Sequence, residues 1–434
     1  MPTVLVTGAA SGIGRATAIH LAEQGWHCLL VDRDGEALDQ LRAALPGSHK
    51  VWRIDLTDAA QVRRLGGSGK SSGPIDAVVN NAGMSDSSGT PLVEQSPAQQ
   101  AALALLNLAA PAAVIAAVDA RLVPGARIVN VSSGAGLRAI PFRGYYSASK
   151  AGLIAQTRAL AAARPDLAVT VLCPGFVRTE LVDGLIAAGR LDPRQAVAKT
   201  PLGRMAEPAE MAQMIGFLAS PGAASISGEV VALCGGSSIY GGSRACEPAT
   251  RALRPMKMPS TLMVEADGAS AWRELAGVSA ETGDSQSRHS GPSAADDETG
   301  VLAQAYPSAI DATALASRID DRHEPGVPPL VAVLHEAARR FARQHAADAS
   351  LTVLLPSDEV QDVAWHRAGD AAAARMLVAT LACELAPRAL RVNAVEVAPG
   401  LAPHDLAPLL QFIGSARAQF FTGQTLRVRH ALRV

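Results

Sequence analysis

The sequence predicts an α/β fold: a Rossmann-like, doubly wound parallel sheet, followed by a second, reduced Rossmann-like α/β domain. Three observations predict it. Strand-like and helix-like segments alternate from residue 4 onward, a glycine-rich turn at 8–14 joins the first strand to the first helix, and the chain has 434 residues. Alternating βαβα order implies a parallel sheet with helices on both faces. One hydrophobic core rarely grows beyond roughly 250–300 residues. We therefore expect a cofactor-binding domain at 1–240, a linker at 241–260 and a second domain at 261–434.

Apolar runs and helical spacing place the elements of the first domain. Strands are expected at 4–7, 28–31, 51–54, 77–80, 127–131, 168–172 and 229–233, and helices at 15–24, 36–44, 98–122, 147–163 and 208–219. The most apolar stretch, 101–118, contains Asn107 and Pro111 and ends at Asp119. A buried helix is therefore expected there, and no membrane span.

The composition excludes several classes of protein. Hydrophobic residues make up 48% and charged residues 18%, which argues against a disordered chain. A net charge of −1 and an aromatic content of 3% give little to bind nucleic acid. Five cysteines without CxxC spacing indicate reduced thiols in a cytoplasmic protein, and a strand at 3–6 leaves no room for a signal peptide. The histidines at 335, 345, 366 and 404 lack metal-ligand spacing, so no metal is expected.

The turn after the first strand has the glycines that a dinucleotide needs. Gly8 permits the tight turn, Gly12 lets the backbone approach a pyrophosphate, and Gly14 lets the helix pack close to the sheet. The helix N-terminus then presents free N–H groups and a positive dipole end to phosphate.

An acidic residue ends the second predicted strand. Asp32 follows Gly14 by 18 residues, where its carboxylate can accept from both ribose hydroxyls and would repel a 2′-phosphate. The sequence therefore favours NAD over NADP. Arg15 and Arg33 flank this position, and either would weaken the preference.

A tyrosine and a lysine share one face of a predicted helix. Tyr146 and Lys150 are four residues apart, in a chain with only four tyrosines and five lysines. A nearby ammonium is expected to lower the tyrosine pKa from its usual value of about 10. Tyr146 would then act as general base in alcohol oxidation and as general acid in ketone reduction.

Taken together, these segments resemble the short-chain dehydrogenases/reductases over about residues 2–240. The resemblance is carried, in order, by Thr7-Gly8-Ala9-Ala10-Ser11-Gly12-Ile13-Gly14, Asp55-Leu56, Asn80-Asn81-Ala82-Gly83, Asn107, Ser132-Ser133, Tyr146-Ser147-Ala148-Ser149-Lys150 and Pro174-Gly175-Phe176-Val177-Arg178-Thr179.

The resemblance implies four catalytic residues: Asn107, Ser133, Tyr146 and Lys150. It implies that Ser133, which lies 13 residues before Tyr146, bonds the substrate oxygen. Lys150 would also hold the nicotinamide ribose, and Asn107 would anchor a water that links the lysine to solvent. By the same spacing, Ser132 is expected to be structural.

The resemblance also implies the cofactor contacts. Asp55 and Leu56 would contact adenine, Asn81 and Gly83 would border the cofactor, and Thr179 would clamp the carboxamide with the Val177 backbone. The full expected set, besides Tyr146 and Lys150, is Gly8, Ser11, Gly12, Ile13, Gly14, Asp32, Asp55, Leu56, Asn81, Ala82, Gly83, Pro174, Gly175, Val177 and Thr179.

Residues 180–205 are expected to form the substrate loop. Leu181, Val182, Leu185 and Ile186 are apolar, and no cluster of cations accompanies them. The leading prediction is an NAD-dependent enzyme acting on a small, fairly apolar secondary alcohol or ketone. One alternative is an NADP-dependent carbonyl or 3-oxoacyl-thioester reductase. An alternative of another class is a catalytically silent cofactor sensor or scaffold. Tyr145, which precedes Tyr146, is not expected to be catalytic; it is expected to pack or to line the substrate pocket.

The last 190 residues contain an internal echo of the first domain. Residues 371–400 align without a gap onto 146–175 at an offset of 225, and 421–430 match the last strand. At that offset Tyr146 corresponds to Ala371, Lys150 to Arg375, Ser133 to Asp358 and Asn107 to Ala332. Arginine stays protonated and alanine has no proton to give, so we expect no second active site.

The copy retains helices near 328–345 and 369–386 that correspond to those flanking the fifth strand. We expect them to cover the matching pair of the first domain as an intrachain pseudo-dimer, with a further homodimer open. Surface loops are expected at 66–73 and 280–300, which are rich in glycine, serine or charge.

Overall fold

The computed structural model describes residues 1–67, 73–86, 88–189, 191–266, 271–277, 305–315, 329–357 and 368–429. The predicted parallel α/β sheet of the first unit is confirmed. It has seven strands in the order β3-β2-β1-β4-β5-β6-β7, all parallel. The strands are β1 Thr3–Thr7, β2 His27–Asp32, β3 Lys50–Arg53, β4 Ile75–Asn80, β5 Leu122–Val131, β6 Ala168–Pro174 and β7 Val230–Leu233.

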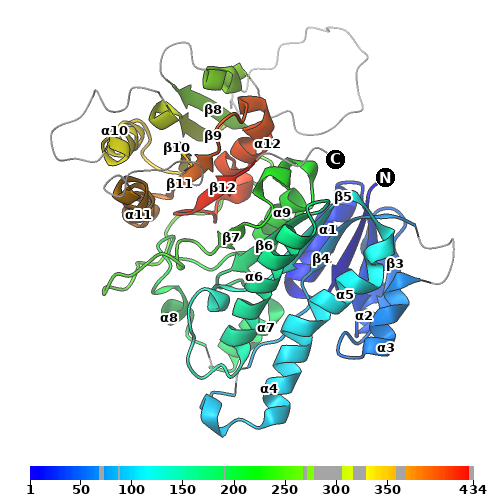
Figure 1. Ribbon diagram of the computed structural model, residues 1–434. Coiled ribbons are helices and arrows are strands. Elements are labelled where there is room, and N and C mark those ends of the chain that lie inside the picture. The colour runs from blue at the N-terminus through cyan, green and yellow to red at the C-terminus, as the bar shows by residue number, and fades with distance from the viewer. Residues whose placement is uncertain are drawn as a thin grey trace, which may run out of the picture.

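Helices cover both faces of this sheet (Figure 1). One apolar core joins α1, α2 and α9 to one face, and a second joins α3 and α5 to the other, where α6 also packs. The helices are α1 Gly12–Glu23, α2 Gly35–Ala44, α3 Ala59–Arg63, α4 Pro97–Ala104, α5 Ala110–Val118, α6 Tyr146–Ala163, α7 Glu180–Ala187, α8 Pro193–Val197 and α9 Pro208–Leu218.

The helix expected at 98–122 is interrupted. A π-helical turn, Leu105–Ala109, separates α4 from α5 and holds Asn107, which is 1% exposed. By length and composition, Pro97–Arg121 is the one described helical stretch that could cross a membrane. About a third of its apolar 18-residue part is buried inside the protein. The prediction of a buried helix is thus wrong for one face. That face exposes Ala101, Leu105, Ala109, Ala112 and Ala116, at helical spacing.

The second unit contains a separate sheet of five parallel strands in the order β12-β11-β10-β9-β8. Sequence patterns had not indicated β9 or α12. The elements are β8 Ser260–Glu265, β9 Tyr306–Asp311, β10 Ala349–Pro356, β11 Leu390–Val397, β12 Thr425–Val428, α10 Pro329–Gln344, α11 Ala368–Leu385 and α12 Pro403–Gly414. Most of the loop at 66–73, residues 280–300, Asp358 and His366 lie outside the described residues.

The two units meet through α9, the 3-10 helix Pro221–Ile226 and α12. The rings of Phe217 and Phe412 stack with centroids 4.2 Å apart, and the Arg429 N–H donates to the Ser225 carbonyl at 3.1 Å. One continuous apolar core includes residues of both units. Figure 1 shows β12 and α12 near β7 and α9, with α10 and α11 farther away.

The expected pairing of long helices is therefore wrong. The sequence placed α10 and α11 of the second unit on α5 and α6 of the first, but α12 makes the contact, and it does so with α9. The physical reason is the chemistry of the faces. The outer face of α10 exposes His335, Glu336, Arg339 and Arg343, whereas α12 buries leucines, Phe412 and Ile413.

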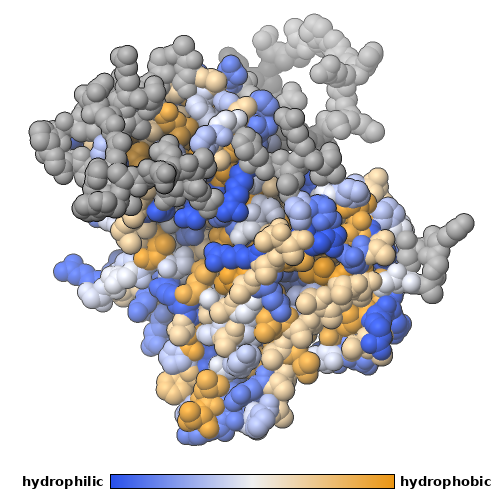
Figure 2. Space-filling model, in the orientation of Figure 1, coloured by the Kyte–Doolittle hydropathy of each residue, from blue (hydrophilic) through white to orange (hydrophobic). Residues whose placement is uncertain are grey.

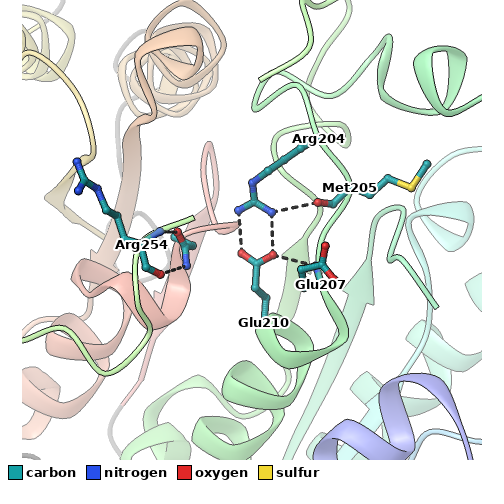
Figure 3. A network of polar contacts seen from close by, with 6 residues as sticks. Arg204, Met205, Glu207, Glu210 and Arg254 are labelled. Atoms are coloured by element: carbon teal, nitrogen blue, oxygen red, sulfur yellow. Dashed lines mark hydrogen bonds and ion pairs between the residues drawn. The ribbon is translucent and has the colours of Figure 1, made fainter. Parts of the chain in front are cut away.

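The segment expected as a linker follows the surfaces of both units. The N–H groups of Cys246 and Ala249 donate to the carbonyls of Ala198 and Gly203, at 2.7 and 2.8 Å. The Arg254 backbone exchanges two hydrogen bonds with the side chain of Gln419. Figure 3 shows Arg254 near the bidentate ion pair of Arg204 with Glu210, at 2.7 and 2.8 Å. The chain between the units is thus tied to the end of the substrate segment.

The shared core predicts energetic coupling between the units. Phe412→Ala is expected to lower the free energy of unfolding by about 3–5 kcal/mol, because a buried aromatic ring is lost. Combined with Phe217→Ala, the loss should fall short of the sum by roughly 0.5–1.5 kcal/mol, the usual coupling of an aromatic pair. Denaturant titration of the four proteins measures this. Phe341→Ala, inside the second unit, is the control and should be additive with Phe217→Ala; equal coupling for both pairs would contradict the shared core.

Candidate active site

The turn between β1 and α1 is held by a residue that follows β4. The Asn81 side-chain amide donates to the carbonyls of Thr7 and Gly8, at 3.1 and 3.2 Å. The Ala82 N–H donates to the Thr7 hydroxyl at 3.1 Å. A Cβ on Gly14 would lie 1.9 Å from the Gly8 carbonyl oxygen, so only glycine permits this packing of helix on turn. Asn81 and Ala82 therefore shape the cofactor turn itself.

Asp32 ends β2 beside the same turn. Its carboxylate accepts from the N–H of Ala10 and of Asp34, both at 3.1 Å. These bonds orient the carboxylate toward the glycine turn, where a ribose would lie. Ser11 and Ile13 flank Gly12 at the N-terminus of α1, a helix of 12 residues, and Ser11 makes no side-chain capping bond. A glycine cradle, a helix N-terminus and an oriented acid together fit a dinucleotide.

The other expected cofactor residues lie at the carboxyl ends of β3 and β6. Asp55 accepts from the N–H and hydroxyl of Thr57, and these hydrogen bonds lower the pKa of Asp55. Leu56, beside it, is buried. Pro174 is the last residue of β6, and the N–H of Gly175, which follows it, donates to the Leu233 carbonyl at 3.0 Å.

The substrate segment begins and ends at one bridge. Val177 pairs in parallel with Ala206, which closes the base of the segment between them. Thr179 follows this bridge and caps α7, its hydroxyl accepting from the Val182 N–H at 3.4 Å. No residue of α7 is buried, and Leu181 is 64% exposed. The apolar side chains of α7 are thus available to a ligand.

Lys150 lies at the centre of the candidate site and is only 4% exposed. Its ammonium donates to the Val131 carbonyl at 3.0 Å. A Cβ on Gly83 would lie 3.2 Å from Lys150 Nζ and 3.1 Å from Asn107 Oδ1, so the missing side chain leaves room for both groups. Burial lowers the pKa of Lys150 to about 8.

The Ser133 hydroxyl lies close enough to the Tyr146 phenol to lower its pKa. The expected lowering of its pKa is wrong for this arrangement. Burial raises the pKa of Tyr146, and the nearby Ser133 hydroxyl and Arg143 charge oppose the rise only in part. Loss of water penalises a phenolate more than these two neighbours favour it. Tyr146 is thus a protonated phenol at neutral pH.

A set of hydrogen bonds holds α6 in place. The Ser132 hydroxyl donates to the Lys150 carbonyl at 2.8 Å, which agrees with the structural role expected of it. The Asn107 amide donates to the Ser149 hydroxyl at 3.1 Å and to the Met84 carbonyl at 2.9 Å. Asn107 thereby links the π-helical turn to α6 and to the segment after β4.

Sequence reasoning missed a buried polar chain beneath these residues. The Asn80 amide donates to the Asn130 side-chain oxygen, and the Asn130 amide donates to the Thr157 hydroxyl, both at 2.9 Å. All three side chains are buried, and they connect β4, β5 and α6. The available signal was an asparagine inside the apolar run of β5.

The arrangement suits proton transfer to an oxygen bound near Ser133. Asn107, Ser133, Tyr146 and Lys150 come together at the carboxyl edge of a parallel sheet, beside the cofactor turn. Within the described ranges, no three His, Cys, Asp or Glu side chains are placed to hold a metal ion. A cavity of about 200 Å³ lies elsewhere, between the linker, the end of the substrate segment and the second unit, and no expected site residue lines it.

Comparison with known proteins places this site in a family. Residues 8–238 match the family described as enoyl-(acyl carrier protein) reductase. The chain is 34% identical over 243 residues to the 3-oxoacyl-[acyl-carrier-protein] reductase FabG of Thermotoga maritima, covering 54% of this chain and 97% of FabG. It is 38% identical over 238 residues to the uncharacterized short-chain type dehydrogenase/reductase y4vI of Sinorhizobium fredii, covering 54% of this chain but only 43% of y4vI.

A similar solved structure supports the same family assignment. The structure of ElxO with NADP bound matches with a TM-score of 0.51 and 25% identity, covering 54% of this chain and 98% of ElxO. The family match extends over more than half of the 434 residues. The chain therefore belongs to the short-chain dehydrogenases/reductases, the oxidoreductases that act on CH–OH and keto groups with NAD(P).

Proposed function

We propose that the protein is an NAD-dependent dehydrogenase/reductase that acts on a secondary alcohol or ketone of a small, fairly apolar substrate. The observation that carries the proposal is the assembly of four side chains: Lys150 buried against the Val131 carbonyl, Asn107 beside it, and Tyr146 close to Ser133. When bound, the nicotinamide supplies the carbon that gives or takes the hydride.

The four side chains have different roles in substrate binding and proton transfer. Ser133 orients the substrate oxygen, and Tyr146 holds the proton that this oxygen gains in reduction or loses in oxidation. Because burial keeps the phenol of Tyr146 protonated, proton donation to a ketone oxygen is favoured at neutral pH. Lys150, with its pKa lowered to about 8, carries positive charge below that pH and loses it above. Asn107 positions α6, on which both groups stand.

The cofactor preference rests on Asp32. Its oriented carboxylate would accept from both ribose hydroxyls and repel a 2′-phosphate. Arg15, which would offset this repulsion, is ion-paired with Glu180. The alternative is an NADP-dependent carbonyl or 3-oxoacyl-thioester reductase. The names of two similar proteins support it: ElxO was solved with NADP bound, and FabG is a 3-oxoacyl-[acyl-carrier-protein] reductase.

The second unit is proposed to be a reduced copy that serves as a fixed intrachain partner. The last crossover supports the copy. The Val169 N–H donates to the Ser227 hydroxyl, and the Gly228 N–H to the Val169 carbonyl. Likewise, the Val392 N–H donates to the Thr422 hydroxyl, and the Gly423 N–H to the Val392 carbonyl. Val392 follows Val169 by 223 residues, so at this crossover the structural match departs by two from the offset of 225 seen in sequence.

A further homodimer would use the face that the second unit leaves open. Figure 2 shows apolar surface over α4, α5 and α6. The exposed alanines and Leu105 of the stretch from α4 to α5 lie on this face. A small-molecule substrate is proposed from the family and the substrate segment. The absence of a nucleic-acid or membrane partner and a cytoplasmic location stay predictions.

Tyr146→Phe tests the proposed chemistry. It removes the proton-carrying oxygen and is expected to lower turnover about 10²–10⁴-fold, the usual contribution of a general acid–base. NAD affinity should persist, because no cofactor phosphate contact is changed. The assay is NAD reduction with a panel of secondary alcohols, in parallel with NADH oxidation on a ketone panel. Tyr145→Phe is the matched control. Full turnover by Tyr146→Phe would remove the proposed role of Tyr146, whereas NAD binding without turnover on either panel by the wild type would favour the silent sensor or scaffold.

Asp32→Asn tests the cofactor preference. Without the carboxylate, NADP affinity should rise on the order of tenfold relative to NAD, since one charge pair near a protein surface is worth about 1–4 kcal/mol. Fluorescence titration of wild type and variant with both nucleotides measures it. Asp39→Asn, on the exposed side of α2, controls for net charge. Tighter binding of NADP than NAD by the wild type would show the alternative cofactor to be correct.

Truncation after Ala245 tests the role of the second unit. It exposes the apolar face of α9 and Pro221–Ile226, including Phe217, Ala223 and Ile226, all now buried. We expect a lower melting temperature and self-association in analytical ultracentrifugation, because this face loses its cover. A truncated protein that remained soluble, fully active and unchanged in oligomeric state would remove the partner role.

A further inference from the structure

One acidic side chain of the substrate segment reaches the cofactor turn. Glu180 is the first residue of α7, and its Oε2 accepts from the Gly12 N–H at 3.1 Å. The other carboxylate oxygen is ion-paired with Arg15, which follows the glycine turn. These two contacts join residues that are more than 160 positions apart in the sequence.

The contact places a negative charge where the cofactor's own charge belongs. Gly12 N–H is among the donors at the N-terminus of α1, which favour anions through the helix dipole. A carboxylate and a pyrophosphate cannot both accept from this one N–H at full strength, and they repel each other at short range. Nucleotide binding at this turn therefore competes with Glu180.

The substrate segment is held unequally at its two ends. Around α7 the side-chain contacts are exposed: Glu180 with Gly12 and Arg15, and Arg178 with Asp183 at 3.1 Å. At the other end, Thr200 and Leu202 are buried, and the Gly203 carbonyl accepts from the linker. Displacement of Glu180 would therefore release α7 and leave the far end in place.

We propose that Glu180 is a charge gate that sets cofactor affinity and couples cofactor binding to release of α7 from the turn. The inference rests on the proposed function, because it takes the ligand of the turn to be a nicotinamide dinucleotide. Entry of the pyrophosphate moves the carboxylate off Gly12 and breaks the contact that joins α7 to the turn.

The first test is binding by Glu180→Gln, which keeps the shape of the side chain and removes its charge. Its Kd for NAD should fall about 2- to 5-fold, the fold-change equivalent of a charge at a helix terminus. NADP should gain by the same factor, since both nucleotides carry the pyrophosphate. Asp183→Asn removes one charge from the same helix without a contact to α1, and its Kd should equal that of wild type.

The second test is hydrogen exchange over residues 180–189. Addition of NAD to the full-length wild type should raise exchange in α7, whereas Glu180→Gln should exchange rapidly with or without NAD. Equal Kd values for wild type and Glu180→Gln would overturn the gate, and exchange that does not respond to NAD in the wild type would overturn the coupling. A wild type that binds neither nucleotide would overturn the proposed function, and this inference with it.

Discussion

The buried ammonium of Lys150 is the constraint around which the site is built. A charge so far from solvent needs acceptors, and the structure provides the Val131 carbonyl with the Asn107 side-chain oxygen nearby. Three features provide this environment. β5 ends at Val131, whose carbonyl accepts from the ammonium, a π-helical turn presents Asn107, and Gly83 after β4 leaves room for both side chains. The Asn80–Asn130–Thr157 chain holds β4, β5 and α6 together beneath the site. The polar groups of the site thus position one another through a single buried charge.

The second unit also has a parallel sheet, and its sequence lacks the lysine on which this site depends. Residues 261–434 contain no lysine and a single tyrosine. Arg375, on α11, is ion-paired with the buried Glu396, which also accepts from Arg427 at 2.9 Å. These pairs tie α11 to β11 and β12. These charged side chains of the second unit therefore hold its helix and sheet together, and the role proposed for the unit rests on the surface of the first unit that it covers.

The contact between the units has a consequence for the site. Gly235, just after β7, donates through its N–H to the Phe420 carbonyl, and the Arg204 guanidinium lies 4.7 Å from the centre of the Phe420 ring. The end of the substrate segment is thus packed against the second unit, while α7 is held by exposed contacts at the cofactor turn. The second unit and the cofactor turn therefore contact opposite ends of one segment.

Local patterns in the sequence determined the strands of the first unit, the glycine turn and the Tyr146–Lys150 pair, because strand alternation, helical spacing and turn chemistry each involve residues a few positions apart. The family resemblance added Asn107 and Ser133 to the catalytic candidates. The run of motifs also placed the chain in its family. Tertiary structure alone decided three features. The cover of the first unit by α12 depends on which helix face is apolar across a distance of two hundred residues. The raised pKa of Tyr146 depends on burial, which spacing does not report. The Glu180 carboxylate meets Gly12 only because a loop after β6 folds back over a helix after β1, a proximity created by the parallel sheet.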